Sequence, residues 1–185
     1  AAICAHQGQP GAIIALGTGS VGEVMHADGG RHEVGGWGFP SSDEASGAWM
    51  GLRAINHLQH ALDGRAAMDD FAQALLKFCG GTRDSVFVWL AQANQTKFAQ
   101  LAPVVLEFAE KSSRAKNILL EAGIEVEKMA NALDPSGTIP VALCGGLAEA
   151  IWSYLPARLL QRVTRPKGDS ALGALILAKS QLLKS

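Results

Sequence analysis

The fold is decided by residues 11–36, which read GAIIALGTGSVGEVMHADGGRHEVGG. This stretch begins with a short apolar run between two glycines, and such a run is typical of a buried strand. Two further strand-like segments follow, and Asp28-Gly29-Gly30 between them is a hairpin turn signal. We therefore predict three consecutive antiparallel strands. They cover residues 12–16, 21–27 and 31–36, with a tight turn at Gly17–Ser20.

A block of helices is expected next, followed by a return to the sheet. Ser41 with Glu44 three residues later fits a capping box, which predicts a helix starting there. An apolar stripe from Trp49 to Leu62 belongs to this first helix, and helical periodicity or helix-breaking residues then mark further helices at about 68–78, 85–92, 101–108 and 118–133. After the Asp134–Gly137 break we expect a strand at 139–144, a helix at 148–154, an edge strand at 161–164 and a last helix carrying Leu172 to Leu182. The order predicts an α/β fold with a mixed sheet and a large helical insertion.

Composition excludes several classes of protein. The 185 residues carry 16 basic and 17 acidic side chains, and this near-neutral balance argues against a nucleic-acid binder. A hydrophobic content of 48% argues against disorder, and no apolar run reaches the length of a membrane span. The three cysteines are scattered without metal-ligand spacing, so we expect no metal site and a reducing, cytoplasmic setting. They are Cys4, Cys79 and Cys144.

The 21 glycines concentrate where a ligand could meet the backbone. The Gly17–Ser20 turn and the Gly145-Gly146 strand–helix junction suit phosphate, although each also suits an ordinary tight turn. Trp37 lies among three glycines, which disfavour a strand end unless a ligand contacts it. The alternative for Trp37 is a core position. Asp43, expected in a first helical turn, serves either the helix dipole or hydrogen bonds from a polyol.

Five stretches together resemble a known family. They are LGTGSVG, GGWGFPSSDEASGAW, FAQLAP, ALCGGLAEA and GDSALGALILAK, and they span nearly the whole chain. The chain resembles the N-acetylglucosamine kinase and bacterial glucosamine kinase family, within the actin, hexokinase and heat-shock chaperone ATPase superfamily. One departure is Ser42-Asp43-Glu44-Ala45, where the family usually has Gly-Asp-Glu-Gly. It adds small side chains at a tight place.

The resemblance implies two RNase H-like lobes with ATP, Mg²⁺ and an amino sugar in the cleft between them. It implies ATP contacts at Gly17, Thr18, Gly19, Ser20, Ala99, Gly145 and Gly146, and amino-sugar contacts at Gly36, Trp37, Gly38 and Asp43. It implies ATP-dependent phosphorylation of glucosamine or N-acetylglucosamine, at the C6 hydroxyl. Gly173 would fall in the family's second connecting helix.

By the same resemblance, residues 1–185 form a single C-terminal lobe. The family's catalytic aspartate precedes a helix like the first residues of this chain, so we expect the general base immediately before Ala1 and no catalytic residue within the chain. The isolated lobe would then be inactive, and its partners would be ATP, an amino sugar and its own N-terminal lobe. A homodimer is one option for its assembly.

Two other functions use the same fold. The related activator ATPases drive electron transfer to an acyl-CoA reductase or dehydratase and hold an iron–sulfur cluster through cysteines. Cys4 and Cys144 lack such spacing, and GGWGFP favours a sugar. A non-catalytic sugar-sensing protein is the third interpretation, and a residue other than Asp before Ala1 would favour it.

Overall fold

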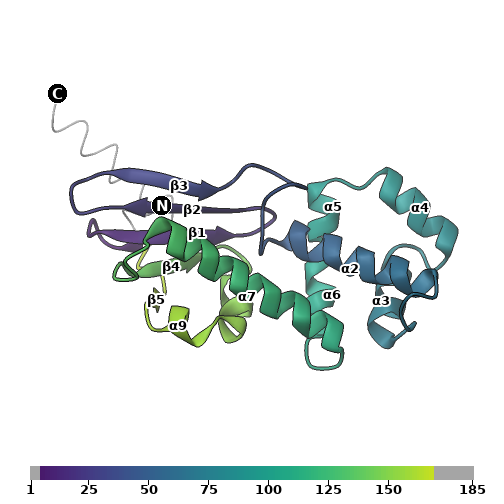
Figure 1. Ribbon diagram of the computed structural model, residues 1–185. Helices are drawn as coiled ribbons and strands as arrows, with labels where there is room; N and C mark the ends of the chain where they lie inside the picture. The colour runs from purple at the N-terminus through teal and green to yellow at the C-terminus, as the bar shows by residue number, and fades with distance from the viewer. Residues whose placement is uncertain (1–4, 169–185) are drawn as a thin grey trace.

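A five-stranded mixed sheet organises the protein. The computed structural model (Figure 1) describes residues 5–168. The strands are β1 (Gly11–Leu16), β2 (Ser20–Met25), β3 (Arg31–Gly35), β4 (Val141–Cys144) and β5 (Val163–Thr164). The strand order is β3-β2-β1-β4-β5; the first three strands pair antiparallel, whereas β4 runs parallel to β1 and β5 parallel to β4. The predicted antiparallel opening and mixed α/β sheet are confirmed.

Helices fill the long stretch between β3 and β4. In Figure 1 the insertion lies beyond the arrowheads of β1 and β3, and α7 runs back along the sheet. The insertion contains α2 (Gly47–Leu62), α3 (Asp70–Phe78), α4 (Arg83–Ala91), α5 (Gln95–Ala99), α6 (Ala102–Glu107) and α7 (Ser113–Leu133). After β4 come α8 (Ala148–Ile151), a 3₁₀ helix (Trp152–Tyr154) and α9 (Ala157–Leu160).

The core lies between the sheet and α7. Ile118, Val126 and other apolar residues at helical spacing bury one face of α7, which contacts β1, β2 and β3. Ile14 and Leu16 of β1 belong to the same cluster, while Ile13 points into a smaller cluster on the opposite face. Burial on both faces explains why β1 reads as a continuous apolar run.

The segment after β3 differs from its prediction. Helix α2 begins at Gly47, and the hydroxyl of Ser46 caps it by accepting a hydrogen bond from the Trp49 amide at 3.2 Å. The capping box expected at Ser41 is wrong, because Asp43 and Ala45 have φ of +64° and +65°. Left-handed residues cannot continue a right-handed helix. Asp43 therefore lies in a turn before the helix, and the expectation of a helix-dipole position is wrong.

Smaller differences concern element ends. The stretch expected as one helix at 101–108 is shorter, since α6 ends at Glu107 and a separate α5 precedes it. The 139–144 strand begins at Val141, and the 148–154 helix finishes as a 3₁₀ turn. The predicted last helix, with Gly173, lies outside the described residues, as does Cys4. Within residues 5–168, no helix has the length and apolar character needed to cross a bilayer.

Candidate functional site

Four strand ends meet at one edge of the sheet. Leu16 at the end of β1 pairs with Ser20 at the start of β2, and Gly35 at the end of β3 pairs with Val21. The parallel neighbour β4 ends beside β1, where Ala15 faces Cys144. The turns that follow β1, β3 and β4 therefore lie along the same edge. These turns carry most of the residues for which nucleotide or sugar contacts were predicted.

The Gly17–Ser20 turn is held by its own backbone and by α2. The Gly17 amide donates to the Gly19 carbonyl at 2.9 Å, and the Gly47 and Ala48 amides of α2 donate to the Gly17 and Thr18 carbonyls at 2.8 and 3.2 Å. Within residues 5–168, the amides of Thr18 and Gly19 and the exposed Thr18 hydroxyl have no hydrogen-bond partner. Such adjacent donors suit an anion.

The Gly145–Gly146 turn packs against the base of this turn. Gly145 has φ of +92°, and a Cβ there would lie 2.3 Å from the Leu16 carbonyl oxygen. The same carbonyl accepts a hydrogen bond from the Leu147 amide at 3.1 Å. Glycine is thus required by both conformation and space. Two exposed or half-exposed glycine turns therefore form one continuous backbone surface.

Asp43 is buried between the Gly17–Ser20 turn and the helical insertion. Its carboxylate accepts the Ser20 amide at 3.1 Å on Oδ1 and the Gln95 side-chain amide at 2.6 Å on Oδ2. Gly19 packs flat on the carboxylate, since a Cβ there would lie 3.0 Å from both oxygens. The Ser20 hydroxyl adds a 2.7 Å hydrogen bond to the Glu44 carbonyl. Asp43 consequently fixes the turn that precedes it by more than twenty residues.

Sequence reasoning missed Gln95. The residue lies at the start of α5, 52 positions from Asp43, and no local pattern marks it. Its contact exists because α5 packs on α2: a Cβ on Gly51 of α2 would lie 1.9 Å from the Phe98 carbonyl oxygen. Ala99 on the same helix approaches Gly47 closely, with 3.3 Å between its Cβ and a Cβ built there. The predicted adenine-side residue therefore lies beside the Gly17–Ser20 turn.

Trp37 projects from the same edge into solvent. Its side chain is 88% exposed, so the core alternative is wrong. Gly36 and Gly38 on either side have φ of +72° and +97°, and the Gly38 carbonyl accepts the Ser42 amide at 3.0 Å. The glycines allow the bend that presents the indole. A large exposed aromatic ring at a glycine-rich edge suits stacking on a ligand.

The described thiols are poor candidates for metal ligands. Burial raises the pKa of Cys79 to about 11 and also raises the pKa of Cys144, so both stay protonated at neutral pH. A thiolate is the form that binds metal. In the part of the chain that the structure describes, no group of three or more His, Cys, Asp or Glu side chains could hold a metal ion.

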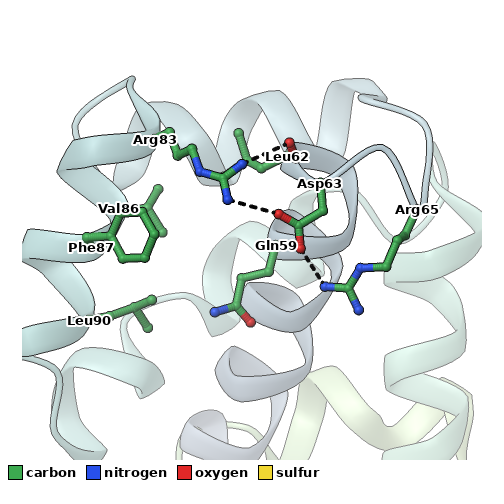
Figure 2. A pocket seen from close by; sticks show the side chains of 8 residues that line it. All are labelled: Gln59, Leu62, Asp63, Arg65, Arg83, Val86, Phe87 and Leu90. Carbon is green, nitrogen blue, oxygen red and sulfur yellow. Dashed lines mark hydrogen bonds and ion pairs between the residues drawn. The ribbon is translucent and has the colours of Figure 1, made fainter.

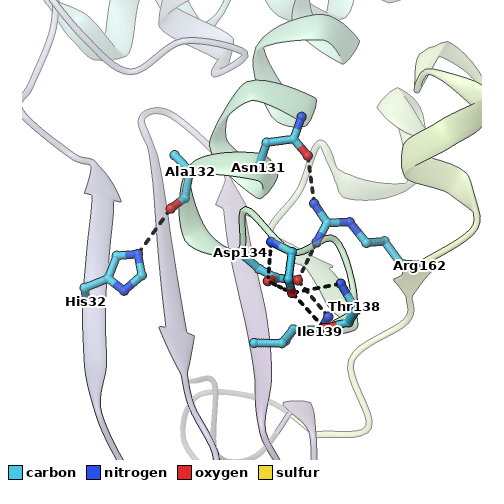
Figure 3. Close-up of polar contacts among 8 residues, drawn as sticks. His32, Asn131, Ala132, Asp134, Thr138, Ile139 and Arg162 are labelled. Atoms are coloured by element: carbon cyan, nitrogen blue, oxygen red, sulfur yellow. Dashed lines mark hydrogen bonds and ion pairs between the residues drawn. The ribbon is translucent and has the colours of Figure 1, made fainter.

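Cavities among the described residues also lie away from this edge, and two of them border ion pairs. One of about 220 Å³ separates α2 from α4, where Asp63 pairs with Arg65 at 2.7 Å and Arg83 at 3.1 Å (Figure 2). Another, of about 620 Å³, lies beside the buried Asp134–Arg162 pair (Figure 3). Neither is lined by a predicted site residue. The predicted residues instead form an open, glycine-lined edge with one protruding ring.

The family model of the BadF/BadG/BcrA/BcrD ATPases matches residues 1–178. The chain therefore belongs to this ATPase family, and its fold is the actin-like ATPase fold. The predicted family resemblance is confirmed.

Particular relatives are named as amino-sugar kinases. The chain is 32% identical to glucosamine kinase GspK of Vibrio cholerae over 96% of its length, and 26% identical to N-acetyl-D-glucosamine kinase of Dictyostelium discoideum over 91%. A crystal structure from Chromobacterium violaceum, provisionally named N-acetylglucosamine kinase, superposes with a TM-score of 0.92 at 49% identity over 95% of the chain. The chain spans about 60% of these relatives: 60%, 59% and 61%.

Proposed function

We propose that this chain is the nucleotide- and sugar-binding lobe of an ATP-dependent hexosamine kinase, which phosphorylates glucosamine or N-acetylglucosamine at the C6 hydroxyl. One observation carries the proposal: the Gly17–Ser20 and Gly145–Gly146 turns abut at the Leu16 carbonyl, so two sets of backbone groups converge on one edge. The names of the relatives agree with this chemistry. The scattered cysteines suit a cytoplasmic enzyme.

The phosphates of ATP would bind at the Gly17–Ser20 turn. The unpartnered amides of Thr18 and Gly19, with the Thr18 hydroxyl, offer donors to the terminal phosphates. Gly145 and Gly146 would let the adenosine approach the backbone, with Ala99 on the adenine side. Mg²⁺ bound with ATP would neutralise charge on the transferred phosphoryl group. Positioning and electrostatics therefore carry the contribution of this lobe.

The sugar would bind where Trp37 projects. The indole offers an apolar face to the sugar ring, and the Gly36 and Gly38 backbone lets hydroxyl and amide groups approach. Asp43 would accept hydrogen bonds from the sugar with the lone pairs that Ser20 and Gln95 leave free.

Catalysis would also need a group that takes the hydroxyl proton. We place this general base on an N-terminal lobe, as an aspartate immediately before Ala1. The share of the relatives' length that the chain leaves uncovered supports a second lobe. A homodimer of the complete enzyme is compatible with this arrangement.

The test uses the full-length protein that carries this lobe. We expect ATP consumption that depends on glucosamine or N-acetylglucosamine, with ³¹P NMR identifying the 6-phosphate. The isolated 185-residue chain should give no transfer. Phosphate transfer to an unrelated acceptor only, or an iron-containing protein whose ATP hydrolysis ignores hexosamines, would contradict the proposal; the latter result would favour the activator function.

Trp37→Ala tests the sugar subsite separately. Loss of an aromatic contact worth about 0.5–1.5 kcal/mol should raise the KM for the sugar by about 2–10-fold while leaving the KM for ATP unchanged. Phe87→Ala is the matched control, since Phe87 is another exposed aromatic residue, 60% exposed, on α4 away from the edge. Equal effects of the two substitutions on the sugar KM would remove Trp37 from the subsite.

A further inference from the structure

The two sides of the proposed nucleotide site belong to different parts of the fold. The phosphate side is the turn between β1 and β2, whereas Ala99 on the adenine side belongs to α5 of the helical insertion. Between them lies the carboxylate of Asp43, which accepts from the Ser20 amide and from the side-chain amide of Gln95. Within residues 5–168, no other side-chain hydrogen bond joins α5 to the 17–20 or 41–46 turns.

Electrostatics makes this connection hard to break. Asp43 is only 4% exposed, and in the part of the chain that the structure describes no cation pairs with it. A buried carboxylate is costly unless it is hydrogen-bonded, and hydrogen bonds to a charged acceptor are the strong ones. The Gln95 amide at 2.6 Å and the Ser20 amide at 3.1 Å are the donors that compensate the charge. Removing one would leave the carboxylate half-satisfied.

We propose that Gln95 is a positioning residue, which locks helix α5 to the phosphate turn through Asp43 and so sets the spacing between the adenine and phosphate sides. This proposal rests on the proposed ATP site. ATP spans both sides, so a preset spacing lowers the ordering cost of binding it. A ligand that reaches only one side gains nothing from the spacing. The lock should therefore favour ATP over either of its halves.

The experiment measures the Kd of three ligands by NMR titration at saturating Mg²⁺. The proteins are the full-length wild type and its Gln95→Met and Gln95→Glu variants. The ligands are ATP, adenosine and tripolyphosphate. Met keeps the length of Gln95 without its donor, so the ATP Kd should rise about tenfold, as expected for losing a hydrogen bond to a charged group. The Kd values for adenosine and tripolyphosphate should stay within about twofold of wild type. Glu opposes a second carboxylate to Asp43, so its ATP Kd should rise further.

Gln92→Met is the matched control. Gln92 follows α4 as its C-cap and is exposed, and among residues 5–168 its side chain accepts one hydrogen bond, from Lys97 Nζ of α5 at 3.0 Å. This contact joins α5 to α4 and does not reach the Gly17–Ser20 turn, so all three affinities should match wild type. An unchanged ATP Kd in Gln95→Met, or an equal loss for all three ligands, would overturn the lock. A wild-type protein that does not bind ATP would overturn both proposals. Binding of ATP without hexosamine phosphorylation would overturn the kinase function alone.

Discussion

Two buried aspartates lie at opposite edges of the sheet, and they are compensated in different ways. Asp43 at the carboxyl edge and Asp134 before β4 are both 4% exposed. Asp134 pairs with Arg162 at 3.0 Å and accepts from the Ile139 amide at 2.7 Å. Among the residues that the structure describes, the Asp43 carboxylate accepts from two neutral donors, the Ser20 amide and the Gln95 side-chain amide. A fully paired charge fixes a structural turn, whereas a charge that retains binding capacity suits a site.

Asp134→Ala should have the largest effect on stability. The substitution removes the anionic partner of Arg162, whose side chain is only 11% exposed, and leaves the neutral Asn131 side chain as its acceptor at 2.9 Å. Breaking a buried pair in this way costs about 3–5 kcal/mol of unfolding free energy, which urea denaturation measures. Glu149→Ala breaks an exposed pair with Arg165 and should cost less than about 1 kcal/mol. Similar losses for the two variants would contradict the distinction.

Acid should affect the same pair. Burial alone would raise the pKa of Asp134, but hydrogen bonds from Ser136 and Ile139 and the charge of Arg162 outweigh burial and lower this pKa below the usual aspartate value. A lowered folded-state pKa stabilises the protein above the unfolded-state value, near pH 4, and this stabilisation is lost as pH falls below it. The difference in stability between wild type and Asp134→Ala should therefore shrink in acid.

Gly145→Ala should give the next largest loss. At this position a Cβ meets both a positive φ and the Leu16 carbonyl oxygen at 2.3 Å. Backbone strain of about 1–2 kcal/mol and overpacking of about 1–3 kcal/mol then add. Gly137→Ala, in the turn after Asp134, is the matched control, because its φ is +72° but nothing lies within 4 Å of its Cβ. Equal losses of unfolding free energy for the two variants, measured by chemical denaturation, would mean that the backbone around Gly145 shifts to accommodate the added methyl group.

Asp43→Asn should destabilise the protein less than Asp134→Ala or Gly145→Ala, but it should weaken sugar binding. The asparagine oxygen can still accept from the Ser20 amide, and Gln95 can flip its side-chain amide to accept from the new NH2 group. Both hydrogen bonds then persist without a charged acceptor, so the unfolding free energy should fall by only about 1–2 kcal/mol. No buried cation is stranded, in contrast to Asp134→Ala. The KM for the sugar should rise as well. A stability loss as large as that of Asp134→Ala would show that Asp43 serves structure alone.

The sheet could be predicted from the sequence, but only part of the candidate site could be. The strands of residues 11–36 were predictable because local alternation and glycine turns encode them. The start of α2 was not, because a capping box at Ser41 looks locally sound and is overridden by the turn around Asp43. Gln95 was invisible for a related reason: its partner is distant in sequence and becomes a neighbour only after α5 packs on α2. The roles of the predicted contact residues remain predictions.

Ala45→Gly should have the smallest effect, and it is expected to stabilise. Ala45 is fully buried and has a φ of +65°. The family that the chain resembles usually has glycine at this position. Left-handed backbone costs an alanine about 1–2 kcal/mol, while glycine loses about 0.4–1 kcal/mol through its more flexible unfolded state, so a gain of about 0.5–1 kcal/mol should remain in denaturant titrations. Loss of stability would mean that the buried methyl group of Ala45 outweighs the strain. A gain accompanied by weaker sugar binding would show that the strain holds Asp43 in its binding position, because strained residues persist where the surroundings impose them.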